Sequence, residues 1–124
     1  MAITLHADAA RSLLIATAVG GLTAAELQDF VRTARTGEQR GWPLLFDAID
    51  ATTTITADDI RALSRRVGAA VRLEGTRAPV AVVAADNNLF GMMRMYQALC
   101  ESEGFGGIGV FRTREAAETW LGQQ

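Results

Sequence analysis

Short apolar runs alternate along this chain with segments that begin like amphipathic helices, and this alternation constrains the fold more than any other feature. The clearest run, PVAVVAA at 79–85, contains only small, β-branched or proline residues, which is typical of a strand covered on both faces. The pattern predicts further strands at these positions: 3–6, 13–19, 43–49 and 107–111. The first two are separated by the polar stretch ADAAR, so we expect them to form a hairpin.

Helix starts follow the later strands and carry recognisable capping residues. Thr23 and Glu26 have the spacing of a capping box, and Thr56 and Asp59 repeat it. The first of these helices is expected to fray near 37–41, a glycine-bounded stretch. A third helix is predicted over 87–99 after the turn sequence DNN, and a fourth starts after Thr113.

The resulting order is ββαβαβαβα, which predicts a single α/β domain over residues 1–124. Strands that alternate with helices imply parallel pairing and right-handed crossovers, so we expect a five-stranded mixed sheet with one opening antiparallel hairpin and four helices. The chain of 124 residues is 49% hydrophobic and 21% charged, with a formal net charge of -2. This composition favours a globular protein, excludes intrinsic disorder and gives no reason to expect nucleic-acid binding.

A single cysteine, Cys100, excludes an intrachain disulfide and fits a reducing compartment. The apolar run at 12–21 resembles the core of a signal peptide, but it passes directly into a helix start. No other run approaches the roughly 20 apolar residues that a membrane-spanning helix needs. We therefore expect a cytoplasmic protein without a membrane span.

Four stretches of the chain together resemble the SpoIIAA-like family, a branch of the STAS-type domains within the STAS/Sec14-like superfamily. They are GLTAAELQDF, PLLFDAID, PVAVVAADNNLFGMMRMYQAL and GVFRTREAAETWL. Within them, FGMMRM and VFRTREAAETWL are the most specific. The resemblance covers the chain from about residue 21 onward, and it implies a compact bacterial, cytoplasmic α/β domain that is usually not an enzyme and binds proteins or small ligands.

One departure from the family pattern concerns regulation. Anti-sigma factor antagonists in this family carry a phosphorylated serine in an Asp-Ser motif followed by glycine. This chain has Thr56, Ala57 and Asp58 at that place. The phosphoserine switch is therefore not expected, and the sequence leaves open whether any of Thr52–Thr56 is phosphorylated. The likeness of this branch to Sec14-like domains implies an alternative function, the binding of a lipid or another small ligand.

Side chains that could perform catalysis are few. His6 lies on the first, peripheral strand, and Cys100 falls on the apolar stripe of its helix, where a buried thiol is typical. We therefore expect no enzyme activity, no catalytic residue, no cofactor and no bound metal.

Aspartates near the predicted strand ends offer a different kind of site. Asp47 and Asp86 are expected at the sheet edge where α/β proteins bind ligands, with Asn87 and Asn88 beside the second of them. Together with Asp50 they could bind Mg²⁺, which predicts a magnesium-dependent phosphoryl enzyme as a further alternative. The competing interpretation is that these residues only cap turns and helices.

The helix at 87–99 contains three methionines and an arginine. Its core face is predicted by helical spacing to contain Leu89, Met92, Met93, Tyr96, Leu99 and Cys100. A second stripe of small residues runs beside that face and would admit another helix closely. We therefore predict an interaction surface, most simply a homodimer contact centred on Met95, that consists of Phe90, Gly91, Arg94, Met95 and Ala98.

Arginines are concentrated in the preceding helix and the segment after it, at 61, 65, 66, 72 and 77. Such a face could attract an acidic partner or an anionic lipid surface. The alternative is a solvated face whose charges match the helix dipole. The function predicted from the sequence is thus a non-catalytic binding or regulatory module that acts through protein–protein contact.

Overall fold

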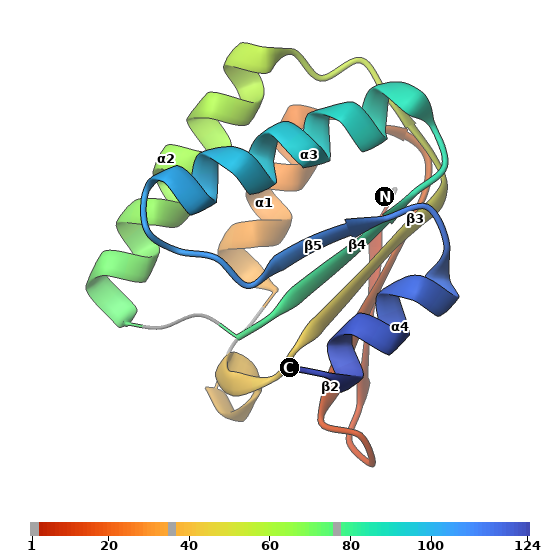
Figure 1. The fold of residues 1–124 in the computed structure, drawn as a ribbon, viewed down its shortest axis with the longest axis vertical. Coiled ribbons are helices and arrows are strands. Elements are labelled where there is room, and N and C mark those ends of the chain that lie inside the picture. Colours follow the sequence, from red (N-terminus) through yellow and green to blue (C-terminus); the bar gives the residue numbers. More distant parts are fainter. Residues whose placement is uncertain (1–2, 35–36, 76–77) are drawn as a thin grey trace.

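The sheet contains the five strands that the sequence predicts, in the predicted order along the chain (Figure 1). The structure, a computed structural model, describes residues 3–34, 37–75 and 78–124. Its strands are β1 (Ile3–Asp8), β2 (Leu13–Leu22), β3 (Leu44–Thr53), β4 (Val80–Ala84) and β5 (Ile108–Phe111). They lie in the order β1-β2-β3-β4-β5, with β1 antiparallel to β2 and every other pair parallel. The predicted order ββαβαβαβα is confirmed.

The helices begin at the capping residues that the sequence indicates. They are α1 (Ala24–Thr33), α2 (Ala57–Glu74), α3 (Asn87–Ser102) and α4 (Arg114–Gly122), with a short 3-10 helix η1 (Gly37–Gly41) where fraying was expected. At α1, the Thr23 hydroxyl accepts from the Glu26 amide at 3.1 Å, and the Glu26 carboxylate accepts from the Thr23 amide at 3.1 Å. Thr56 and Asp59 form the same reciprocal pair at α2. These bonds satisfy amides that have no partner inside a helix.

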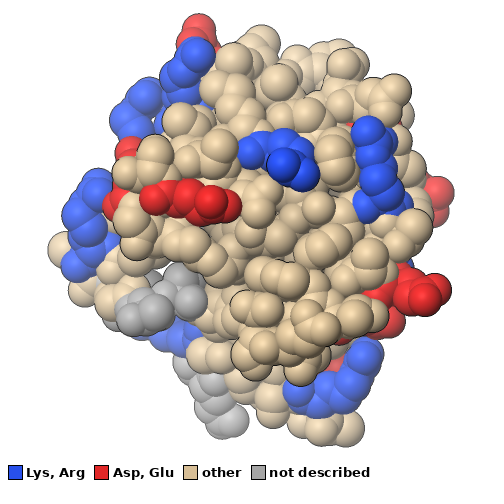
Figure 2. Space-filling view, in the orientation of Figure 1, with Lys and Arg blue, Asp and Glu red and all other residues tan. Residues whose placement is uncertain are grey.

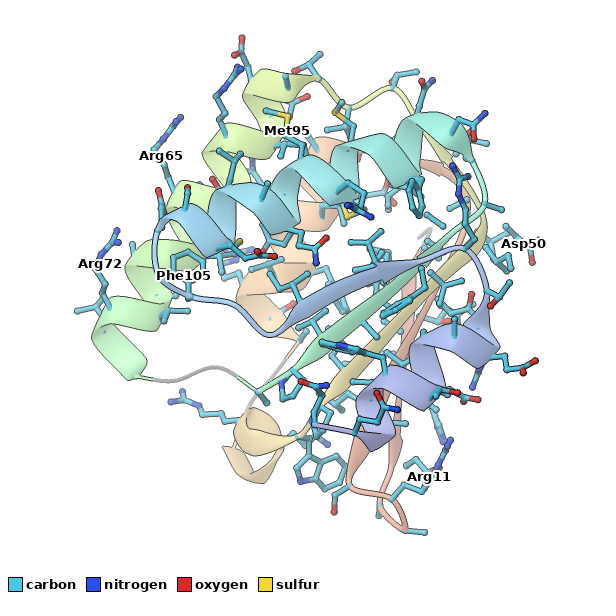
Figure 3. All side chains as sticks on the ribbon, in the orientation of Figure 1. Arg11, Asp50, Arg65, Arg72, Met95 and Phe105 are labelled. Atoms are coloured by element: carbon cyan, nitrogen blue, oxygen red, sulfur yellow. The ribbon has the colours of Figure 1, made fainter. Side chains whose placement is uncertain are left out.

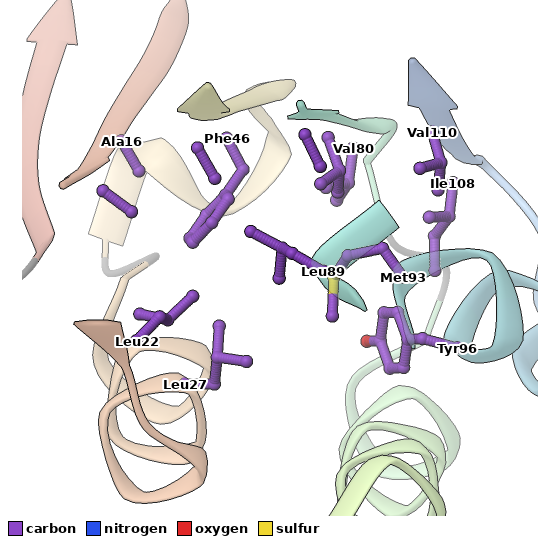
Figure 4. Packing of buried hydrophobic residues seen from close by; sticks show 14 of the residues in the cluster. Ala16, Leu22, Leu27, Phe46, Val80, Leu89, Met93, Tyr96, Ile108 and Val110 are labelled. Carbon is purple, nitrogen blue, oxygen red and sulfur yellow. The ribbon is translucent and has the colours of Figure 1, made fainter. Parts of the chain in front are cut away.

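Helices α1, α2 and α3 cover one face of the sheet, and α4 covers part of the other (Figure 1). Right-handed crossovers between parallel strands place successive helices on the same face, whereas α4 folds back onto the opposite one. The main core lies under the three helices, where Phe46 of β3 belongs to one cluster with Leu27 of α1 and with Leu89 and Met93 of α3 (Figure 4). A smaller core forms between α4 and the sheet.

Two strands extend beyond their predicted ends. β2 continues to Leu22 and β3 to Thr53, because the two strands pair along these extensions after a register shift. At the end of the pair, the Thr53 hydroxyl donates to the Leu22 carbonyl at 2.7 Å and accepts from the Ile55 amide at 3.1 Å. This longer β3 moves Asp47 from the predicted strand end to the middle of the strand.

The two edges of the sheet differ. β5 is short and largely buried, and the Gln97 side chain of α3 donates to its Ile108 carbonyl at 2.8 Å. β1 is longer, and every residue between its ends is exposed. In the part of the chain that is described, no helix is both long and apolar enough to cross a membrane.

Candidate functional site

The start of α3 brings together residues from two neighbouring strand ends. The Asp86 carboxylate caps the helix by accepting from the Leu89 amide at 3.0 Å. Arg112, which follows β5, donates to the Ala85 carbonyl at 2.9 Å and to the Asn87 side-chain oxygen at 3.0 Å. Asp86 is therefore at a strand end, as expected, but its carboxylate has a capping role.

Arg112 also covers Phe90. Its guanidinium carbon lies 3.8 Å from the ring centroid, which is a cation–π contact. The sequence interpretation missed Arg112, because Arg112 and Asn87 are 25 positions apart and no local pattern connects them. Phe90 is consequently partly buried and packs against the main core, so its side chain is not fully exposed to solvent.

Asp47 does not lie where the sequence predicted it. It is in the middle of β3, on the α4 face, and only 8% exposed. Its carboxylate accepts from Arg114 at 3.3 Å and from the Ile49 amide at 3.2 Å. Both oxygens are thus engaged within the protein, and Asp47 is not at the end of its own strand, where the sequence interpretation put it.

The strand-end aspartates do not form the metal site that the magnesium alternative requires. Across the described ranges, no three His, Cys, Asp or Glu side chains gather closely enough to hold a metal ion. Asp50 is exposed on β3, and Figure 3 shows it pointing outward at the edge of the molecule. Asn88 is also exposed, on the first turn of α3.

The predicted interaction surface on α3 is exposed except at Phe90 and Met95, which are partly buried. Gly91, Arg94 and Ala98 are exposed, whereas Met95 is partly buried and packs against the main core. Figure 3 shows Met95 on the side of α3 that lies beside α2. Packing between the two helices therefore accounts for part of the apolar character of Met95.

The buried residues of the same helix follow the predicted stripe. Cys100 is fully buried, and Leu89, Met93 and Tyr96 are buried with it. Met92 and Leu99 are partly buried against the same cluster. The methionine content of the helix is thus explained mainly by core packing.

The arginines of α2 do not form one uniform basic patch. Arg61 pairs with Asp58 at 2.7 Å, while Arg65 and Arg72 project from the helix into solvent. Figure 3 labels these two side chains, and Figure 2 shows acidic atoms among the basic ones on that side of the molecule. Residue 77, the last of the predicted group, lies outside the described residues. The mixed charges fit a solvated helix face.

A pocket of about 510 Å³ lies between β1 and α1, far along the sheet from β5. Its lining is mostly apolar and consists of Ile3, Leu5, Ala25, Glu26, Asp29, Phe30, Thr33 and Ala34. His6, on the same strand, is exposed on the peripheral strand as the sequence predicts.

Comparison with known proteins identifies the fold. No family model matches the sequence, and no curated protein matches it. The structure is similar to a solved structure of an uncharacterized protein of the DUF3478 family, with a SpoIIAA-like fold, from Shewanella loihica PV-4. The two chains share 18% identity with a TM-score of 0.57, and the likeness covers 97% of this chain and 92% of the other.

Proposed function

From the SpoIIAA-like fold of this chain, we propose that it is a non-catalytic binding module that acts in the cytoplasm through contact with a protein partner. The contact is placed on the α3 face, which we define as Gly91, Arg94 and Ala98 with the flanking Phe90 and Met95. The observation that carries this proposal is the position of Gly91.

Gly91 lies in the interior of α3, where a glycine costs the helix about 1 kcal/mol relative to alanine. It does not have a positive φ, and a Cβ atom added to it would meet no atom within 4 Å. Neither backbone conformation nor internal packing therefore requires a glycine here. A partner that approaches the helix backbone closely would require one, and exposed Ala98 lies two turns further along the same surface.

Arg94 supplies a polar group beside this small-residue surface. It is exposed, and it makes no ion pair within the described part of the chain, including with Glu101. A partner with a smooth apolar surface and a carboxylate next to it would match the α3 face, because arginine binds carboxylates in a bidentate geometry.

The internal contacts of the polar groups also favour a binding module. Asp47 is engaged with Arg114, Asp86 caps α3, and Arg112 is held by a carbonyl, an amide and an aromatic ring. These contacts connect the starts of α3 and α4 to the strands. We infer that the polar residues at this edge shape the surface that a partner meets.

The test uses a matched pair of glycine substitutions. A partner is captured from the source cell, purified, and titrated against the wild type, Gly91→Arg and Gly122→Arg. Gly122 is also an exposed helical glycine with no atom near its added Cβ, but it lies in α4. We expect Gly91→Arg to weaken binding by about tenfold or more and Gly122→Arg to leave it unchanged. Equal affinity of both variants and the wild type would contradict the α3 face.

A further inference from the structure

α3 carries two opposite charges that do not pair with each other or with any neighbour in the described part of the chain. Arg94 and Glu101 are both exposed, and neither forms an ion pair with a described residue. A charge on a helix can pair with a residue three or four positions away, but no opposite charge stands at those positions from either residue. Both charges are therefore available to a partner.

The two charges lie along one side of the small-residue surface of α3. Gly91 and Ala98 are seven positions apart, which is about two helical turns, so they lie on one line along the helix. Arg94 and Glu101 follow these two residues by three positions each, so they form a second line beside the first. Exposed Ser102 extends the line of small residues, and its hydroxyl donates to a backbone carbonyl at 2.9 Å. A partner that covers it therefore leaves no hydroxyl donor unpaired.

The α3 face itself has the properties that the proposed function requires of a partner, namely a small uncharged surface with a carboxylate beside it. Arg94 and Glu101 are placed symmetrically about a point between Gln97 and Ala98. A two-fold axis at this point sets two α3 helices antiparallel and brings Arg94 of each copy opposite Glu101 of the other. Because both residues lie on the same side of the small residues, both ion pairs form along the same side of the contact. The charges of this face are thus complementary to a second copy of the same face.

We propose that the α3 face binds a second copy of this chain, with the two α3 helices antiparallel across a two-fold axis beside Ala98. Reciprocal pairs between Arg94 and Glu101 select the antiparallel orientation, because parallel helices would set like charges opposite each other. Gly91 of each helix then lies near Ser102 of the other, so small residues meet at both ends of the contact and the two backbones approach closely. The inference rests on the proposed function and adds the identity of the partner: the protein captured from the source cell is this chain itself.

The first experiment is sedimentation velocity of charge-reversed variants over a range of protein concentrations. We expect the wild type to dimerise, and Arg94→Glu and Glu101→Arg each to weaken dimerisation by about tenfold or more, because each sets like charges opposite each other. An equimolar mixture of the two variants should dimerise like the wild type, since both contacts then join opposite charges again.

Glu115→Arg is the control for the reversals, because Glu115 is an exposed glutamate of α4, on the other face of the sheet. It should dimerise like the wild type. A monomeric wild type, or a mixture that dimerises no more tightly than the single variants, would overturn the proposal.

The second experiment tests the position of the axis by oxidation of Ala98→Cys and Gly122→Cys. A disulfide requires Cα atoms about 4.4–6.8 Å apart, which residues beside the axis of two closely packed helices satisfy. Gly122 is an exposed residue of α4, and the native Cys100 is buried and gives a low background. We expect Ala98→Cys to form covalent dimers much faster than Gly122→Cys. Equal rates would contradict the antiparallel contact.

The second copy and the proposed function can fail separately. A monomeric wild type whose α3 face binds a different protein, with the binding weakened by Gly91→Arg, overturns the second copy and leaves the proposed function in place. A wild-type dimer that the charge reversals leave unchanged also overturns the α3 pairing. The titration of Gly91→Arg against the captured partner then decides the proposed function on its own.

Discussion

Gly91 and Gly109 illustrate how local surroundings set the role of a glycine. Both have φ angles that other residues can adopt. A Cβ atom on Gly91 would meet nothing, whereas on Gly109 it would lie 2.6 Å from the Phe111 ring and 3.2 Å from Trp120. Internal packing therefore explains the glycine in β5 but not the one in α3.

We predict that Gly91→Ala raises the free energy of unfolding by about 0.5–1 kcal/mol, because alanine loses less backbone entropy in a helix. Gly109→Ala should lower it by about 1–3 kcal/mol through overpacking against the two aromatic rings. Urea unfolding of each variant at low protein concentration measures both effects. A loss of stability in Gly91→Ala would show that the glycine has a role inside the protomer.

At the turn between β1 and β2, Asp8 forms an ion pair with Arg11, and this pair affects the pKa of Asp8. The Arg11 guanidinium donates to the Asp8 carboxylate at 2.8 Å, and this hydrogen bond lowers the pKa of Asp8 below its usual value. A lowered pKa in the folded state stabilises the fold at pH values above the ordinary carboxyl pKa. That contribution disappears as the pH falls through the lowered value.

Arg11→Met should therefore raise the pKa of Asp8 toward its usual value and remove this contribution. An NMR titration of the Asp8 carboxyl carbon measures the shift directly. Arg32→Met, which removes an exposed arginine of α1 that pairs with Asp29, serves as the control and should leave the pKa of Asp8 unchanged. An Asp8 pKa that Arg11→Met does not raise would refute the assignment.

At the scale of whole elements, the starts of the helices are better specified by sequence than the ends of the strands. Thr23 with Glu26 and Thr56 with Asp59 act within four residues, so their spacing predicts the caps that are observed. β3 extends through DATT, which has no apolar run, because this segment pairs with the end of β2. Pairing between distant segments leaves no signal in the local pattern.

The start of α3 is held by an interaction between elements, and we predict that Arg112→Leu loosens it. The substitution removes the cation–π contact with Phe90 and the hydrogen bonds to Ala85 and Asn87. The free energy of unfolding should fall by about 1 kcal/mol, and amide exchange should accelerate in the first turn of α3.

Arg112→Lys is the control for this prediction, because it keeps the positive charge but loses the planar fork. It should fall between the wild type and Arg112→Leu in both measurements. If neither variant changes the exchange of the first turn, then Asp86 alone holds the start of the helix.

In the whole molecule, contacts between segments that are far apart in the sequence explain why the candidate site was only partly predictable. Asp47 and Arg114 are 67 positions apart, and their pairing depends on α4 packing opposite to the other helices. Sequence periodicity predicts which face of a helix is buried, but it does not assign the helix to a side of the sheet. The small residues of the α3 face were predictable, while the partial burial of Met95 against its neighbours was not.

The sequential strand order has a further consequence for the whole molecule, since it leaves β1 at one edge and β5 at the other. α3 protects β5 through Gln97, whereas β1 has an apolar pocket beside it. The two edges of the sheet therefore differ in their surroundings: α3 covers the β5 edge, and an apolar pocket borders β1.

Amide hydrogen exchange of the intact protein, measured with and without the captured partner, tests the proposed α3 face most directly. We predict that added partner slows exchange along α3 and leaves β1 unchanged, and that Gly91→Arg abolishes the slowing. An α3 whose exchange does not respond to the partner would contradict the proposal.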